Sequence, residues 1–273
     1  MIRRNLKRLY SQFTDSRRKA FWVLRNGSAS STTPLFIVGS QRSGTGMLGE
    51  VLGKSPEIEN LGESDPRAFE NYFIRDVGTV SQLIRDCKYR FLVFKPLKDS
   101  ERIRDLLSLS PSGKALWAYR FYMDRINSAV KEFGRHPLEV FAAFARGDRS
   151  AWQMQAIDPE VERVVMSFNA AELTAHDGAA LMWWVRNSLY FTQDLGSDSR
   201  IRLWSYDRFV RDPGRGLESL LGFIGANSYP YMLSDVHADS FRKDTEPVLR
   251  AEIRELCQSL QERLEQASAR QPS

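Results

Sequence analysis

A short loop bounded by two glycines is the part of this sequence whose residue types could do chemistry. Four apolar residues, Leu35 to Val38, precede the loop, and an apolar run with helical spacing follows it over 47–52. The loop itself runs from Gly39 to Gly44. A strand, a tight turn and a helix start bring backbone N–H groups together, and the helix dipole adds positive potential there. The segment therefore predicts a site that binds a phosphate group.

The residues after the second glycine indicate which phosphate chemistry to expect. Gly39 and Gly44 have the spacing of the nucleotide-triphosphatase loop, G-x-x-x-x-G-K-S/T, but Thr45 stands at the lysine position and Gly46 at the metal-ligand position. Enzymes that split a triphosphate need both that lysine and that hydroxyl. A cation occurs earlier in the loop instead, at Arg42. The sequence disfavours an ordinary kinase or ATPase and favours a loop that holds one phosphate without a metal.

A second pair of polar residues follows another apolar run. Arg120 comes directly after the run 115–119, and Ser128 lies in the helix predicted after it. An arginine offers a planar fork of donors to a phosphate, and a serine hydroxyl adds one more. Taken alone, an arginine after a strand is usually a surface residue, and a serine such as Ser128 is usually an ordinary helical residue. They indicate a second phosphate site only in combination with the loop.

Strand and helix signals alternate from residue 35 onward, and these elements must position the polar groups. Apolar strands are predicted at 35–38, 91–94, 115–119 and 201–206, separated by segments with helical spacing, and the polar stretch 135–176 is expected to cover the active face. The last helix is predicted to start near Thr245, with Pro247 in its first turn. The alternation predicts an α/β fold, a P-loop-type parallel sheet with helices on both faces. Ligands bind such sheets at the carboxyl ends of the strands.

Length and charge place limits on the whole chain. The 273 residues, 42% of them apolar, fit one large α/β domain. Two cysteines, Cys87 and Cys257, cannot make a disulfide framework, so a reducing, cytoplasmic location is the simpler interpretation. Residues 1–25 hold eight Lys or Arg against one acid, a net +7, which leaves −2 for the rest of a chain with net charge +5. The folded part is close to neutral, and nucleic-acid binding is not expected.

The basic N-terminal segment has an amphipathic pattern. Its apolar residues follow one helical face: Ile2, Leu6, Leu9, Tyr10 and Phe13. A basic amphipathic helix can lie on an anionic membrane surface, and it can equally pack on its own domain. No run approaches the roughly 20 apolar residues of a membrane span, and no signal peptide is expected. We expect a basic arm and linker over 1–33, which allows peripheral membrane contact, and one domain over 34–266.

Together, the loop and the Arg120 segment resemble the sulfotransferases that use 3′-phosphoadenosine 5′-phosphosulfate (PAPS), in their bacterial-type and carbohydrate-modifying branches. That family binds the 5′-phosphosulfate with an R/K-S-G-T loop, here 42–45, and the 3′-phosphate with R-(x)₇-S, here Arg120 to Ser128. The segment Tyr206 to Pro213 is similar to the family's Y-E-D-L-x-x-D-P, and an L-x-x-L-L-x-F-I-G helix follows it. The likeness covers roughly residues 34–260, and it implies the sulfotransferase fold.

The resemblance also implies a donor site without a metal. Its members would be Gln41, Arg42, Ser43, Gly44, Thr45, Gly46, Arg120, Ser128 and Arg242. Arg42 would stabilise charge that grows on the leaving phosphate oxygen. Two departures stand out. The family's second loop threonine is replaced by Gly46, and Arg242 lies in a Phe-Arg-Lys segment that lacks the family's following glycine.

Sulfuryl transfer to a hydroxyl also needs a general base. The segment 94–97, where cytosolic small-molecule members carry a histidine, has none, although Lys95 fits the family lysine that contacts the sulfo group. The base is then expected to be a carboxylate, as in the carbohydrate- and tyrosine-modifying branches, with Glu63 first and Glu59 or Asp65 as alternatives.

The resulting hypothesis is a PAPS-dependent sulfotransferase in which Arg42, Lys95 and Glu63 act on a hydroxyl of a glycan, a glycolipid or a peptide. Two alternatives stay open. One is a small-molecule kinase with a degenerate phosphate loop, and the other is a non-catalytic module that uses the basic arm at a membrane surface.

Overall fold

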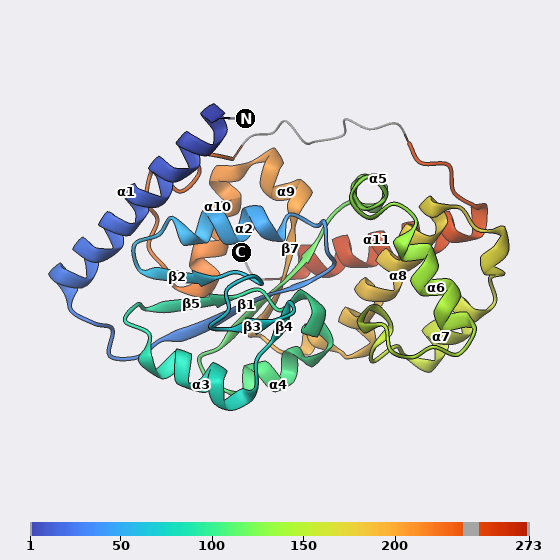
Figure 1. Ribbon diagram of the computed structural model, residues 1–273, viewed down its shortest axis with the longest axis horizontal. Coiled ribbons are helices and arrows are strands. Elements are labelled where there is room, and N and C mark those ends of the chain that lie inside the picture. Colours follow the sequence, from blue (N-terminus) through green and yellow to red (C-terminus); the bar gives the residue numbers. More distant parts are fainter. Residues whose placement is uncertain (1, 237–245, 272–273) are drawn as a thin grey trace.

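The computed structural model describes residues 2–236 and 246–271, with residues 2–13 described by their backbone alone. Five parallel strands form the central sheet in the order β2-β5-β1-β6-β7 (Figure 1). Their bounds are β1 Thr33–Gly39, β2 Ile58–Leu61, β5 Phe91–Phe94, β6 Lys114–Tyr119 and β7 Ile201–Ser205. The predicted α/β fold with a parallel sheet is confirmed.

Helices cover both faces of this sheet, because alternate residues of its strands are apolar on either side. In β1, Leu35 and Ile37 pack into a core with the helices α2 (Thr45–Gly53), α9 (Tyr206–Arg211) and α10 (Pro213–Ile224). Phe36 and Val38 point to the opposite core. The helices of that second core are α3 Val77–Asp86, α4 Ile103–Ser108, α5 Tyr122–Phe133, α6 His136–Ala145, α7 Pro159–Met166, α8 Ala175–Thr192 and α11 Ala251–Arg270.

The elements that escaped the sequence prediction include helix α3, the edge strand β2 and a short hairpin. The edge strand β2 holds two polar residues between Ile58 and Leu61, which hides the apolar signal of a strand. The hairpin of β3 (Phe69–Glu70) and β4 (Phe73–Ile74) has strands of two residues each, too short for any periodicity. Its turn residues Asn71 and Tyr72 have φ of 51° and 66°. A carboxylate oxygen of Asp99 accepts a hydrogen bond from the N–H of Ile74 at 2.8 Å and ties the hairpin to the fold.

The start of the last helix is a correction. α11 begins at Ala251, and Pro247 lies ahead of it in a segment without helical structure. The N–H of Arg250 donates to a carboxylate oxygen of Asp177 on α8 at 3.0 Å, which fixes the extended backbone just before the helix. Thr245 lies outside the described residues.

The N-terminal segment forms one long helix, α1 (Ile2–Asn26), which runs along the β2 side of the sheet (Figure 1). Its C-terminal half packs on the domain through Trp22, whose ring centroid lies 6.5 Å from that of Tyr89. Among the described helices none is both long and apolar enough to cross a bilayer.

Candidate functional site

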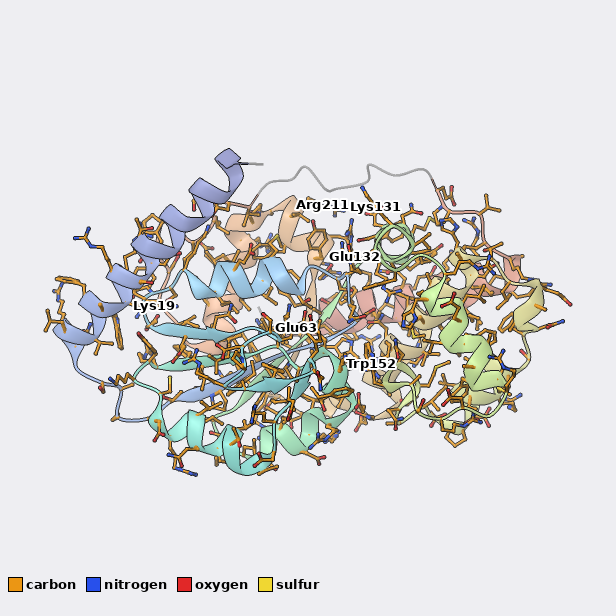
Figure 2. The ribbon with its side chains drawn as sticks, viewed as in Figure 1. Lys19, Glu63, Lys131, Glu132, Trp152 and Arg211 are labelled. Carbon is orange, nitrogen blue, oxygen red and sulfur yellow. The ribbon has the colours of Figure 1, made fainter. Side chains whose placement is uncertain are left out.

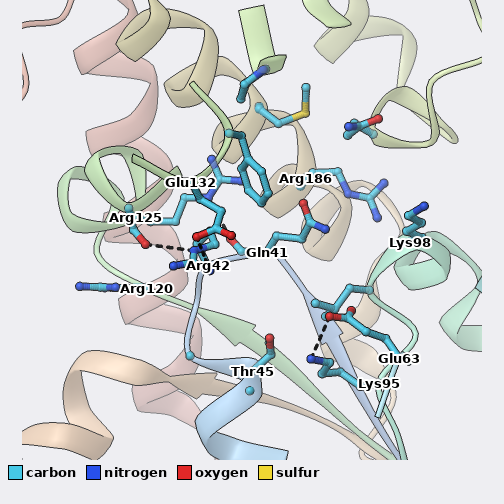
Figure 3. A pocket seen from close by; sticks show the side chains of 18 of the residues that line it. Gln41, Arg42, Thr45, Glu63, Lys95, Lys98, Arg120, Arg125, Glu132 and Arg186 are labelled. Atoms are coloured by element: carbon cyan, nitrogen blue, oxygen red, sulfur yellow. Dashed lines mark hydrogen bonds and ion pairs between the residues drawn. The ribbon is translucent and has the colours of Figure 1, made fainter. Parts of the chain in front are cut away.

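A cavity of about 770 Å³ opens at the carboxyl ends of β1, β5 and β6, where the sequence placed the chemistry. Figure 3 shows Arg42, Arg120, Arg125 and Glu132 on one side of it and Glu63, Lys95 and Lys98 across from them. The arginines and lysines among these residues come from separate elements, and together they make the cavity suited to an anionic ligand.

The glycine-bounded loop is shaped by two close approaches. Gly39 and Gly44 have φ of 113° and 81°, in the region that favours glycine. A Cβ on Gly39 would lie 2.4 Å from the carbonyl oxygen of Ala118, and one on Gly44 would lie 2.1 Å from Cδ2 of Tyr206. The spacing of the two glycines is therefore fixed by neighbours on β6 and α9, not by the loop alone.

The loop also leaves donors available for an anion. Gly44 is the N-cap of α2 and supplies no side-chain cap, so the first N–H groups of this helix have no capping side chain. The hydroxyl of Ser43 is fully buried and has no hydrogen-bond partner within the described part of the chain. These features fit a bound phosphate, which takes up orphan donors at a helix N-terminus.

Arg42 links the loop to the second predicted motif. Its Nε donates a hydrogen bond to the Ser128 hydroxyl at 3.1 Å, and one of its terminal nitrogens lies 3.4 Å from a carboxylate oxygen of Glu132 (Figure 3). Arg42 has a φ of 66°, a conformation that is unusual for a residue with a side chain. The structure thus brings together two motif residues that are 86 positions apart.

Arg120 directly follows the last residue of β6 and lines the same cavity. Its guanidinium carbon is 4.7 Å from the ring centroid of Tyr206, the ring that closes on Gly44, and its Nη2 lies 3.7 Å from a carboxylate oxygen of Asp124. The indole N–H of Trp183 donates to the Arg120 carbonyl at 3.2 Å. Arg120 and the glycine loop are consequently neighbours, joined through one tyrosine ring.

Glu63 and Lys95 form an ion pair with each other on the side of the cavity opposite Arg42, with 3.1 Å between the carboxylate oxygen and the ammonium nitrogen (Figure 3). Their side chains are 28% and 17% exposed, so both reach the cavity from partly buried positions. The alternative acids Glu59 and Asp65 are both held by Arg67, at 2.8 Å each, and neither lines the cavity. The Arg67 hydrogen bond lowers the pKa of Asp65.

The remaining predicted donor residues divide into two groups. Gln41, Thr45 and Gly46 line the cavity together with Gly44, while Ser43 lies buried behind the loop. Arg242 lies outside the described residues.

Sequence reasoning missed Arg125, which is buried on α5. Its Nε donates to the Gln41 carbonyl at 3.0 Å and its Nη1 to the Ala179 carbonyl at 2.9 Å. Burial, with the nearby charge of Arg42, lowers the pKa of Arg125 to about 10. A helical arginine normally reaches solvent, so only the packing of α5 against α8 reveals this role.

Two more residues of the cavity wall went unnoticed. Arg186 on α8 is 2% exposed, and its guanidinium lies 3.1 Å from a carboxylate oxygen of Glu101. Its position inside an apolar helical stripe was the sequence signal that could have indicated its burial. His136 at the start of α6 lines the cavity with a side chain that is 59% exposed.

The sequence matches no known family profile and no curated protein. The structure resembles the sulfotransferase domain of the Synechococcus PCC 7002 olefin synthase, with TM-score 0.52 and 15% identity over 85% of this chain and 96% of that one. It is equally similar to a sulfotransferase domain from the curacin biosynthetic pathway, with TM-score 0.52 and 15% identity over 85% of this chain and 99% of that one. At this identity the likeness shows the fold: the chain folds like these sulfotransferase domains.

Proposed function

We propose that this protein is a sulfotransferase that moves the sulfo group of PAPS to a hydroxyl of a glycan, a glycolipid or a peptide, in the manner of the bacterial-type and carbohydrate-modifying branches. One observation carries the proposal. The phosphate loop and the Arg120–Ser128 segment meet at a single cavity, through the Arg42–Ser128 hydrogen bond and the Tyr206 ring. A donor with two separate phosphate groups needs two such anion sites side by side.

The loop side of the cavity would hold this donor, which supplies an activated sulfo group on a stable phosphate leaving group. The loop N–H groups and the Thr45 hydroxyl would bind the 5′-phosphate end, and Arg120 with Ser128 the 3′-phosphate. Arg42 would hold the bridging oxygen as negative charge develops on it. Protein cations neutralise the leaving phosphate, so the residues assign no role to a metal.

Glu63 and Lys95 would serve the acceptor side. The Glu63 carboxylate would take the proton of the acceptor hydroxyl, and the Lys95 ammonium would steady the sulfo group during transfer. Their ion pair keeps both side chains oriented toward the cavity before any ligand arrives. The free thiols Cys87 and Cys257 are compatible with the cytoplasmic location that we propose.

The binding test removes the second phosphate site. Arg120→Ala should weaken binding of the desulfated donor, 3′-phosphoadenosine 5′-phosphate, by roughly 10- to 100-fold in titration calorimetry, the range expected for charge-assisted hydrogen bonds. Arg67→Ala is the matched control, because that guanidinium pairs with Glu59 and Asp65 away from the cavity. Unchanged affinity in Arg120→Ala would contradict the donor assignment.

The chemical test uses labelled PAPS and a crude glycan, glycolipid and peptide extract. Glu63→Gln should keep donor binding and abolish most transfer, whereas His136→Asn should keep transfer, although His136 lines the same cavity. If transfer failed in His136→Asn and persisted in Glu63→Gln, the general base would be His136 and not Glu63. ATP binding that depends on magnesium, without sulfo transfer, would favour the kinase alternative.

A further inference from the structure

Helix α1 turns a polar face toward the domain. The guanidinium carbon of Arg18 lies 3.7 Å from the ring centroid of Tyr231, and its Nη1 donates to Asp15 at 2.9 Å. Trp22 lies one turn further along the same face. Lys19, labelled in Figure 2, is also on this side, where burial lowers its pKa despite the nearby charge of Glu59. The helix is therefore attached mainly by charged and aromatic side chains.

The opposite face of α1 carries apolar side chains into solvent. Phe21 is 62% exposed and Leu24 is 84% exposed. Exposed Arg17 and Arg25 lie beside them, so the four residues form one outward face. A surface helix ordinarily places its apolar stripe on its own core, whereas α1 leaves Phe21 and Leu24 exposed.

The sequence continues the same helical spacing of apolar residues toward the N-terminus. Leu6 precedes Leu24 by 18 residues, which is five turns of an α-helix. Tyr10 precedes Phe21, and Phe13 precedes Leu24, by 11 residues, close to three turns. The apolar positions of the first half of α1 thus share the register of the face that is exposed in its second half.

We propose that this outward face of α1, defined by Arg17, Phe21, Leu24 and Arg25, binds the surface of an anionic bilayer. An apolar stripe flanked by basic residues is the pattern of helices that lie in the headgroup region. Residues 1–25 carry a net +7, which is complementary to an anionic surface and opposes contact with a second, equally basic copy of the helix. The proposal does not depend on the sulfotransferase assignment.

The first test uses the full chain and vesicle flotation. Wild-type protein should bind vesicles that contain phosphatidylglycerol and bind phosphatidylcholine vesicles at least about ten-fold more weakly. Phe21→Ser/Leu24→Ser should reduce binding to the anionic vesicles by about ten-fold or more. The control Met166→Ser/Val248→Ser removes two other exposed apolar side chains, 41% and 84% exposed, and should bind as wild type.

A second variant tests the charge. Arg17→Glu/Arg25→Glu should also lose anionic-vesicle binding, and added salt should weaken the wild type in the same way. Titration with the desulfated donor should be unchanged in every α1 variant, which separates this proposal from the proposed function.

Two results would overturn the proposal. One is equal vesicle binding by wild type and Phe21→Ser/Leu24→Ser. The other is a wild-type dimer in sedimentation velocity that this variant converts to a monomer, without any vesicle binding, because the outward face would then be a contact between copies.

Discussion

Around the glycine loop, charged side chains are held in place by residues that are distant in the sequence. Arg42 is fixed by Ser128 and Glu132, Arg120 rests on Tyr206, and Arg125 holds the carbonyl that precedes Arg42. Each of these contacts joins the loop or β6 to a helix that starts after another strand. The positions of the cations are thus a property of the assembled sheet.

Arg125 offers a test of this positioning. Arg125→Met should weaken binding of the desulfated donor by about ten-fold and should destabilise the fold by roughly 1–3 kcal/mol, because the buried carbonyl of Ala179 and the partly buried carbonyl of Gln41 lose their donor. Arg125→Lys keeps the charge and one donor, so it should recover part of both losses. Calorimetry measures the affinity for the desulfated donor, and urea unfolding measures the stability of the fold. Lost stability with unchanged donor affinity would reduce Arg125 to a structural residue.

At the level of elements, the sequence located the long apolar strands and the phosphate loop because their signals are local. It could not locate β2 or the β3–β4 hairpin, whose strands are short or half polar. The burial of Arg125 was equally hidden, because it follows from how α5 and α8 pack. The arm was predicted as a helix, but the spacing did not reveal which face meets the domain. The roles of Arg42, Lys95 and Glu63 stay predictions.

The start of α2 provides a matched pair of glycine substitutions. Gly44→Ala places a methyl group 2.1 Å from the Tyr206 ring at a φ of 81°, so it should destabilise the fold by at least about 1–3 kcal/mol and impair donor binding. Gly46→Ala, two residues later, meets nothing within 4 Å and should leave stability unchanged or raise it by up to about 1 kcal/mol. Urea unfolding of both variants decides the matter; equal stabilities would show that the ring does not constrain the loop.

On the scale of the whole molecule, stability depends on buried charges that connect separate elements. Asp207 at the start of α9 is one of them: its carboxylate accepts the N–H of Phe121 at 2.6 Å, just after β6 and Arg120. Burial raises the pKa of Asp207 above its ordinary value of 3.8, even though that hydrogen bond and the charge of Arg120 favour the ionised form. The folded state therefore disfavours the carboxylate relative to the unfolded chain.

This shift predicts how global stability changes with pH. Between pH 3.8 and the raised pKa, the folded state binds more protons at Asp207 than the unfolded state does, so this group's contribution to stability increases as the pH falls. Asp207→Asn keeps an acceptor for the Phe121 N–H and lacks the charge. The variant should gain most over the wild type at neutral pH, and its advantage should shrink on acidification toward pH 3.8, with a slope of at most about 1.4 kcal/mol per pH unit. Urea unfolding of both proteins across this range measures the difference in their free energies of unfolding. The other buried acids are the same in both proteins, so their contributions cancel in this difference. A difference that does not vary with pH would mean that Asp207 is as well solvated in the fold as in the unfolded chain.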